Sequence, residues 1–180
     1  MRRIIAVLSM MAVMLGLASG VALALNQVTC TGLVDPSDPS SEGALCDGAT
    51  KADQITGSPY FDNIDAYAGS DIVDGQAGNE VIDGGRGSDT LTGGDGSDFV
   101  VGRDGNDTID LRDSTGSTEG FPEVAFGYAG NDTIYAADGN ADTIYCGAGK
   151  DSVTYDQFDT VNDETFNPAD CEKATLVTVP

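Results

Sequence analysis

Histidine is absent from this sequence and basic residues are scarce: 8 Lys and Arg face 30 Asp and Glu, a formal charge of −22 over 180 residues. Without histidine and without a C-x-x-C pair, the chain lacks the common ligand pattern of a zinc site. It also lacks a G-x-S-x-G motif, which disfavours a hydrolase with a serine nucleophile. The negative charge opposes binding to nucleic acid and to anionic membranes. The acids themselves are therefore the candidate functional groups.

An apolar run long enough to suggest a membrane span is also lacking. Arg2 and Arg3 precede a short apolar run, 4–17, and small residues at Ala22 and Ala24 follow it. This pattern predicts a secretory signal peptide over 1–24 and a secreted, extracellular protein, either released or associated with the cell wall. The alternative, an uncleaved membrane anchor, is disfavoured because the run is short for a bilayer.

Cysteine is limited to four residues, all after the predicted signal peptide: Cys30, Cys46, Cys146 and Cys171. An even number of cysteines in an exported chain predicts disulfides. Three connectivities are possible, and we favour sequential pairing, Cys30 with Cys46 and Cys146 with Cys171. Such bonds would staple the ends of a repeat array, where the last coil has no neighbour. A zinc site is the competing interpretation.

Glycine is abundant, with 24 residues, and it is regularly spaced. Written in nines from Gly48, the chain gives seven units without a gap to Asp110. Two of them, 84–92 and 93–101, are complete G-G-x-G-x-D-x-U-x nonapeptides, in which U is aliphatic. Glycine at the fourth position lets the backbone turn so that carbonyl groups converge. The eighth residue is predicted to face inward from a short strand.

The nine-residue phase is lost over 111–126 and resumes over 127–154. We interpret 111–126 as an insert or a degenerate repeat, most simply a loop outside the array. A weaker unit over 118–126 would carry Glu123, and a shortened unit near the C-terminus would carry Asp159.

This array resembles the RTX, or haemolysin-type, calcium-binding repeat family over roughly residues 48–154, and the chain is most similar to small Sec-exported bacterial proteins built from such repeats. The resemblance implies an all-β fold: a parallel β-roll, or right-handed β-solenoid, of about five to six coils. Two nonapeptides would form each coil, and calcium would lie in the turns between consecutive coils. Toxin and enzyme domains are common in the family, but no second domain is predicted here.

The predicted organisation has six segments. They are a signal peptide, 1–24; an N-terminal cap segment with Cys30 and Cys46, 25–47; seven contiguous repeats, 48–110; the insert or degenerate repeat, 111–126; three further repeats, 127–154; and a C-terminal cap with Cys171, 155–180.

Acids at the sixth position of each unit are the candidate metal ligands. They are Asp53, Asp62, Asp71, Glu80, Asp89, Asp98, Asp107, Asp132, Asp142 and Asp151. The resemblance implies that consecutive coils share ions, with these pairs: Asp71 and Asp89, Asp89 and Asp107, Asp62 and Glu80, Glu80 and Asp98. Calcium takes six to eight oxygens, which carboxylates and turn carbonyls supply. Because one aliphatic residue per strand gives a thin core, we expect folding to depend on several bound Ca²⁺ ions.

The sequence therefore favours a calcium-binding extracellular module, structural or adhesive, that is not an enzyme. A disordered acidic chain is the simplest alternative, but disorder has no reason to keep a nine-residue phase. A second alternative is a carbohydrate- or ice-binding surface on the outer strand positions. A third is a polysaccharide-acting enzyme that uses paired carboxylates. Partners other than calcium would be a cell-surface glycan or a protein.

Overall fold

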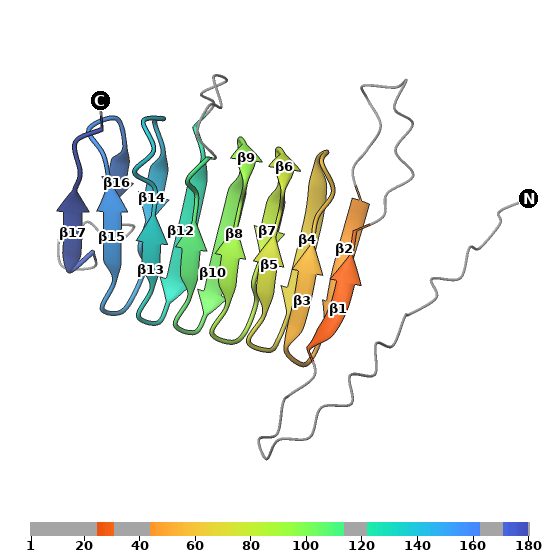
Figure 1. Cartoon of the computed structure of the whole chain (residues 1–180). Helices are drawn as coiled ribbons and strands as arrows, with labels where there is room; N and C mark the ends of the chain where they lie inside the picture. Colours follow the sequence, from red (N-terminus) through yellow and green to blue (C-terminus); the bar gives the residue numbers. More distant parts are fainter. Residues whose placement is uncertain (1–24, 31–43, 114–121, 163–170, 180) are drawn as a thin grey trace, which may run out of the picture.

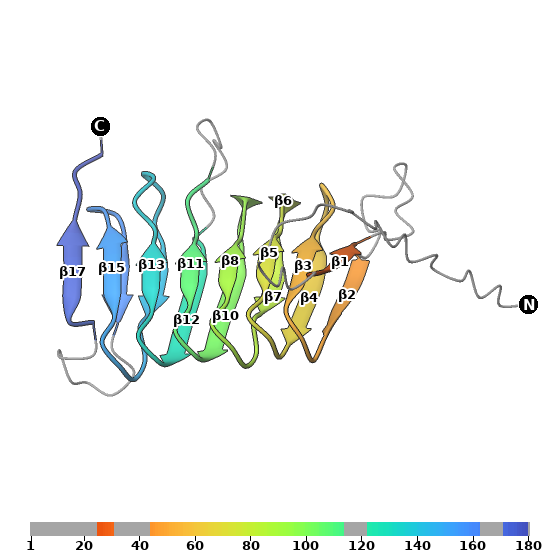
Figure 2. The ribbon, with the colours of Figure 1, turned by 60° about the horizontal axis from the view of Figure 1, so that its bottom comes forward.

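The chain forms a parallel β-solenoid of about six turns. The computed structural model describes residues 25–30, 44–113, 122–162 and 171–179, and within these residues the elements are strands and turns. Successive strands alternate between two facing sheets, so the chain winds from one sheet to the other along the length of the molecule (Figures 1 and 2). This confirms the all-β roll expected from the repeat. In the part of the chain that the structure describes, no helix is long and apolar enough to cross a bilayer.

Each sheet contains every second strand of the winding. The eight-stranded sheet consists, in order, of β1 (Asn26–Thr29), β3 (Asp53–Thr56), β5 (Ile72–Asp74), β8 (Thr90–Thr92), β11 (Thr108–Asp110), β13 (Thr133–Tyr135), β15 (Ser152–Tyr155) and β17 (Lys173–Leu176). The seven-stranded sheet consists of β2 (Ala44–Ala49), β4 (Asp62–Tyr67), β7 (Val81–Asp83), β10 (Phe99–Asp104), β12 (Val124–Ala129), β14 (Thr143–Tyr145) and β16 (Thr160–Asn162). Two short strands in neighbouring turns, β6 (Ala77–Gly78) and β9 (Asp95–Gly96), pair with each other.

The register between strands follows the repeat. Val73 of β5 lies beside Leu91 of β8, and Ile82 of β7 lies beside Val100 of β10, so residues two repeats apart are neighbours. Any other register would take the aliphatic residues out of their shared stack. The pairing extends past the repeats at both ends, because β1 pairs with β3 and β17 pairs with β15.

The core lies between the two sheets and consists mainly of the eighth-position residues. They are at most 1% exposed: Ile55, Ile64, Val73, Ile82, Leu91, Val100, Ile109, Ala125, Ile134, Ile144 and Val153. Several first-position residues complete it, among them Leu111 and Ala136. The core is one side chain thick per strand, as the repeat predicts, since strand neighbours alternate between the two faces.

The irregular segment 111–126 contains a degenerate repeat. Val124 lies between Phe99 and Thr143 in the seven-stranded sheet, and Ala125 takes the buried eighth position. Acids one coil apart are separated by 18 residues in the contiguous repeats before this segment but by 25 across it, so the unit carries seven additional residues in its turn. The simplest expectation, a loop outside the array, is therefore wrong for residues 122–126. Residues 114–121 lie outside the described residues.

Both disulfides form as sequential pairing predicts. Cys30 and Cys46 are bonded at the N-terminal end, with their Cα atoms 5.5 Å apart. Cys146 and Cys171 are bonded at the opposite end, 5.6 Å apart. Each bond joins a residue next to one sheet to a residue in or next to the other, which closes the roll at its first and last coils.

Candidate metal sites

The sixth-position acids form two rows inside the roll, one along each edge where the chain turns between sheets. Positions six and eight are two residues apart, so a strand directs both side chains to the inner face. The first acid row consists of Asp53, Asp71, Asp89, Asp107, Asp132 and Asp151. The second acid row consists of Asp62, Glu80, Asp98, Glu123, Asp142 and Asp159. All of these except Asp159 are at most 2% exposed.

Successive acids of a row touch across coils. In the first acid row the backbone N–H of Asp71 donates to Asp89 Oδ1 at 2.8 Å, and that of Asp89 donates to Asp107 Oδ1 at 2.9 Å. In the second acid row the N–H of Glu80 donates to Asp98 Oδ1 at 2.7 Å. The structure therefore brings together the acids that the sequence pairs, while their role as ligands remains a prediction.

Many carboxylate oxygens of these rows are buried and accept no hydrogen bond. Both Oε atoms of Glu80 and Glu123 are in this state, and so is Oδ2 of Asp71, Asp89, Asp98, Asp107, Asp132 and Asp142. A buried oxygen anion without a donor or a cation is costly. Hard oxygen donors, buried and spaced one coil apart, suit Ca²⁺, which prefers carboxylates and carbonyls over nitrogen or sulfur. The donor set therefore fits the metal that the repeat implies.

The first two units fit this pattern less well. The Oδ2 of Asp53 accepts the N–H of Ala49 at 2.5 Å, and Asp62 accepts the N–H and hydroxyl of Ser58. The turns of these units therefore already use one oxygen of Asp53 and both oxygens of Asp62, while Asp53 Oδ1 has no hydrogen-bond partner. The sequence offers a reason, because Lys51 and Tyr60 stand where later units have the fourth-position glycine.

Burial raises the pKa of several carboxyls in the two acid rows, because a charged form is poorly solvated between the sheets. The pKa of Asp89 and of Asp132 is raised to about 7 by burial, opposed by a backbone hydrogen bond and reinforced by neighbouring acids. The pKa of Asp142 is raised to about 8 and that of Glu123 to about 11, burial again being the main cause. Without a cation, the rows would have to hold protons at neutral pH.

The fourth-position glycine lets the turns stack closely. Gly87 has a φ of +149°, and a Cβ at this position would collide with the carbonyl oxygen of Gly69 in the preceding coil. The N–H of Gly87 donates to the carbonyl of Asp104 in the following coil at 2.8 Å. Close stacking of this kind brings the turn carbonyls and the carboxylates of consecutive coils together.

A comparison with family models agrees with this geometry. A model of the RTX calcium-binding nonapeptide repeat matches four times, over residues 47–79, 74–109, 120–153 and 127–160. The chain belongs to this family. RTX repeats imply calcium binding on a β-roll, so calcium is the ion expected along the acid rows. None of the curated proteins or solved structures compared with the chain matches it.

The RTX pattern gave Glu123 and Asp159 only as acids of weaker units, and it missed Asp113 and Asp138. Glu123 was only a weaker expectation, yet it is fully buried in the second acid row. Asp159 continues that row, since its Oδ1 accepts the N–H of Asp142 at 3.0 Å. Asp113 and Asp138, at the third position of their units, lie with Glu123 in one cluster. The sixth position of the weaker unit over 118–126 identifies Glu123, whereas no repeat signal points to Asp113.

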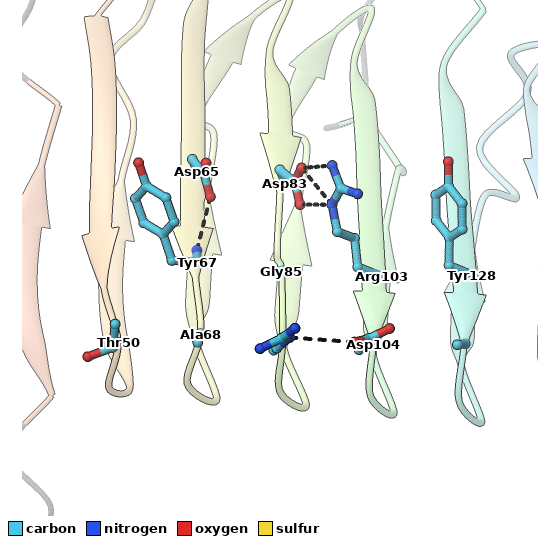
Figure 3. Close-up of a pocket in the computed structure, with 11 residues that line it drawn as sticks. Thr50, Asp65, Tyr67, Ala68, Asp83, Gly85, Arg103, Asp104 and Tyr128 are labelled. Atoms are coloured by element: carbon cyan, nitrogen blue, oxygen red, sulfur yellow. Dashed lines mark hydrogen bonds and ion pairs between the residues drawn. The ribbon is translucent and has the colours of Figure 1, made fainter.

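A groove of 680 Å³ lies outside the acid rows, along the turns that lead into the eight-stranded sheet (Figure 3). Tyr67, Arg103 and Tyr128 line it from the second position of their units, with positive φ of 65°, 78° and 70°. Gly85 occupies this position between Tyr67 and Arg103 and leaves the groove open there. Arg103 Nε donates to Asp83 Oδ1 at 2.6 Å, and both tyrosines are almost half exposed.

Proposed function

We propose that this protein is an exported module, structural or adhesive, whose folding is coupled to calcium. The observation that carries the proposal is the pair of acid rows, in which buried carboxylate oxygens one coil apart have no hydrogen-bond partner. Bound Ca²⁺ would neutralise carboxylates of consecutive coils and would compensate for the solvation they lose. The sixth-position acids would hold the ions, together with turn carbonyls.

The coupling follows from the small size of the core. One buried aliphatic residue per strand contributes about 1.5–3 kcal/mol. Ordering a nine-residue unit costs about 1.5 kcal/mol per residue, which exceeds that contribution several-fold. Repulsion between stacked carboxylates adds to the cost. A metal ion that binds only the folded chain stabilises the folded state. Bound calcium therefore supplies part of the free energy that the core lacks.

An extracellular location fits this coupling. Calcium modules outside the cell bind at roughly 10⁻⁴–10⁻³ M, so such a chain stays largely unfolded where calcium is scarce and folds after export. The pattern of Arg2, Arg3 and the apolar run at residues 4–17 supports export. The two disulfides also suit an oxidising compartment.

A calcium titration tests the function. The chain with its disulfides intact is followed by far-UV circular dichroism from chelator to millimolar calcium, and calorimetry gives the number of ions. We expect a cooperative gain of β-structure and several bound ions, with magnesium at the same concentration much less effective. An unchanged β spectrum between chelator and calcium would contradict coupled folding.

Recognition of a neutral glycan is a second candidate function, supported by the groove of Figure 3. Non-glycine residues with positive φ cost roughly 1–2 kcal/mol each, and three of them line this groove. The faces of Tyr67 and Tyr128 with the polar pair of Arg103 and Asp83 combine apolar planes and directional hydrogen bonds, which suit a sugar ring. We propose no enzymatic role for it.

The glycan candidate is tested by binding. A glycan array with the calcium-loaded chain identifies a ligand, and titration of that ligand then compares Tyr67→Ala and Tyr128→Ala with wild type. Tyr60→Ala is the control, because Tyr60 is similarly exposed but lies outside the groove. We expect both groove variants, and not the control, to lose about tenfold or more in affinity. Equal affinity for all three would remove this candidate.

A further inference from the structure

One acidic cluster differs from the RTX acid rows in the positions that its residues occupy. Asp113, Glu123 and Asp138 each place a carboxylate oxygen within 4.8 Å of the others. Glu123 is a sixth-position acid, but Asp113 and Asp138 come from the third position of their units. Asp113 also lies outside the residues that the family model matches.

Glu123 shows that the cluster is suited to a ligand. It is fully buried, and neither of its carboxylate oxygens has a hydrogen-bond partner. The two third-position aspartates are half-buried, so the cluster opens toward solvent while Glu123 lies at its inner side. A buried carboxylate that faces two further carboxylates needs a cation or a proton, and a cation can serve all three carboxylates at once.

The two aspartates are held in place by donors of the surrounding turns. Asp113 Oδ1 accepts the N–H of Gly96 at 3.1 Å, and its Oδ2 accepts Nδ2 of Asn140 at 3.0 Å. Asp138 Oδ2 accepts the N–H of Asp113 at 3.0 Å. The cluster and its donors therefore span three consecutive coils, and its carboxylates are oriented before any ion binds.

The basic residue next to the cluster in sequence, Arg112, makes its side-chain hydrogen bonds to Asp110. Arg112 donates to Asp110 through Nε at 2.8 Å and through Nη2 at 2.7 Å, and its guanidinium lies 5.0 Å from the centre of the Tyr135 ring.

We propose that Asp113, Glu123 and Asp138 form an additional calcium site, one that uses third-position side chains and is the first to fill. Oxygens that bind Ca²⁺ lie about 2.4 Å from it, so two ligands on opposite sides are about 4.8 Å apart, as the cluster allows. Three carboxylates supply more charge than the two of a pair within an acid row, and affinity rises with the charge of the ligands. The inference rests on the proposed calcium function.

The test is a calorimetric calcium titration of the full chain, disulfides intact, comparing wild type with the double variant Asp113→Asn and Asp138→Asn. Asparagine keeps the size of the side chain and one of the two oxygens with which each aspartate accepts hydrogen bonds. Asp104→Asn is the matched control, since Asp104 is a third-position acid on the opposite edge with an exposed side chain. We expect the double variant to bind one calcium ion fewer than wild type, and its tightest binding step to be at least tenfold weaker. The control should match wild type in both.

Equal stoichiometry and affinity in wild type and the double variant would overturn the inference and leave the RTX function intact. Wild type that binds no calcium would instead contradict the proposed function. Circular dichroism at saturating calcium checks the fold of each variant. An anomalous difference map of wild-type crystals grown with Tb³⁺ needs no variant: a peak bonded to all three carboxylates supports the site, and peaks along the acid rows alone overturn it.

Discussion

At the residue scale, the sixth-position acid is an ionisable carboxylate that is almost completely buried, a combination that is rare in proteins. Asp89 is 1% exposed and lies between Asp71 and Asp107 in the first acid row. A buried carboxylate at this position hydrogen-bonds the backbone of the preceding coil and retains one oxygen without a partner. The oxygen without a partner is a candidate metal ligand. The oxygen that accepts the backbone hydrogen bond links consecutive coils.

Asp89→Ala should weaken calcium binding more than Asp53→Ala. Asp89 has acid neighbours in both adjacent coils, while Asp53 begins its row and already binds its own turn through Ala49. Losing charged contacts of 1.5–3 kcal/mol predicts a fall of at least about tenfold for Asp89 and a smaller one for Asp53. Calcium titration of both variants measures the difference, and equal losses would contradict the assigned order of the row.

Gly87→Ala should destabilise the roll more than Gly139→Ala. Both glycines have positive φ, but a Cβ at Gly139 meets only Val179 Cγ2 at 3.8 Å, whereas one at Gly87 collides with the Gly69 carbonyl. The control thus carries the cost of the backbone conformation alone, roughly 1–2 kcal/mol. Urea unfolding at saturating calcium compares the two, and indistinguishable midpoints would show that the turns have room for a side chain.

At the scale of the element, each turn and strand is stable only when the next coil of the roll packs against it. A unit presents one aliphatic and one acidic side chain to the interior, and neither is satisfied until the next coil pairs with it. The aliphatic residue gains from being covered, but the acid requires a cation or a proton. The acid rows therefore make the stability of each coil depend on the calcium concentration and the pH.

In calcium-free buffer the roll should be more stable at pH 5 than at pH 8. Unfolded carboxyls titrate near pH 4, whereas in the folded chain the pKa of Asp89 and Asp132 is raised to about 7 and that of Asp142 to about 8. The folded state thus binds more protons, and the stability they bring is lost as the pH rises through these values. Circular dichroism in the absence of calcium checks this.

With calcium present, the pH dependence of stability should be reversed. The ion competes with protons for the same carboxylates, so its affinity rises with pH over the range in which the protons leave. Calcium titrations at pH 6 and pH 8 follow the reversal. A folded fraction independent of pH without calcium would contradict the burial of these acids.

At the scale of the whole molecule, the roll is an open stack with two ends. Each coil contacts only its neighbours, so an end coil is covered on one side alone. The disulfides lie at these ends, Cys30 with Cys46 and Cys146 with Cys171, and the central coils have none. The placement indicates that covalent bonds stabilise the coils that packing stabilises least.

Replacing Cys146 and Cys171 by serine should loosen the C-terminal coils before the centre. The bond closes a segment of 25 residues, and a loop of that size contributes about 3–4 kcal/mol in the chain-entropy account. Hydrogen exchange at saturating calcium should show faster exchange in β15 and β17 with little change in β8. Uniform acceleration along the roll would indicate that it unfolds as one unit, and no change would show that the bond is not needed.

The sequence by itself determined the winding, the buried aliphatic stack and the pairing of acids such as Asp71 and Asp89. This is possible because each unit of a strict repeat makes the same contacts as its neighbours. Residues at the same position of units two apart in the sequence are therefore neighbours in a sheet. The position of the cysteines at the ends of the array favoured sequential disulfide pairing among three possibilities, and the structure has this pairing. Only the tertiary structure decided the role of 111–126, which interrupts the repeat in sequence but not in the sheet. It alone also placed Asp113 and Asp138 beside Glu123, since side chains from two consecutive coils meet there and no local pattern encodes their distance.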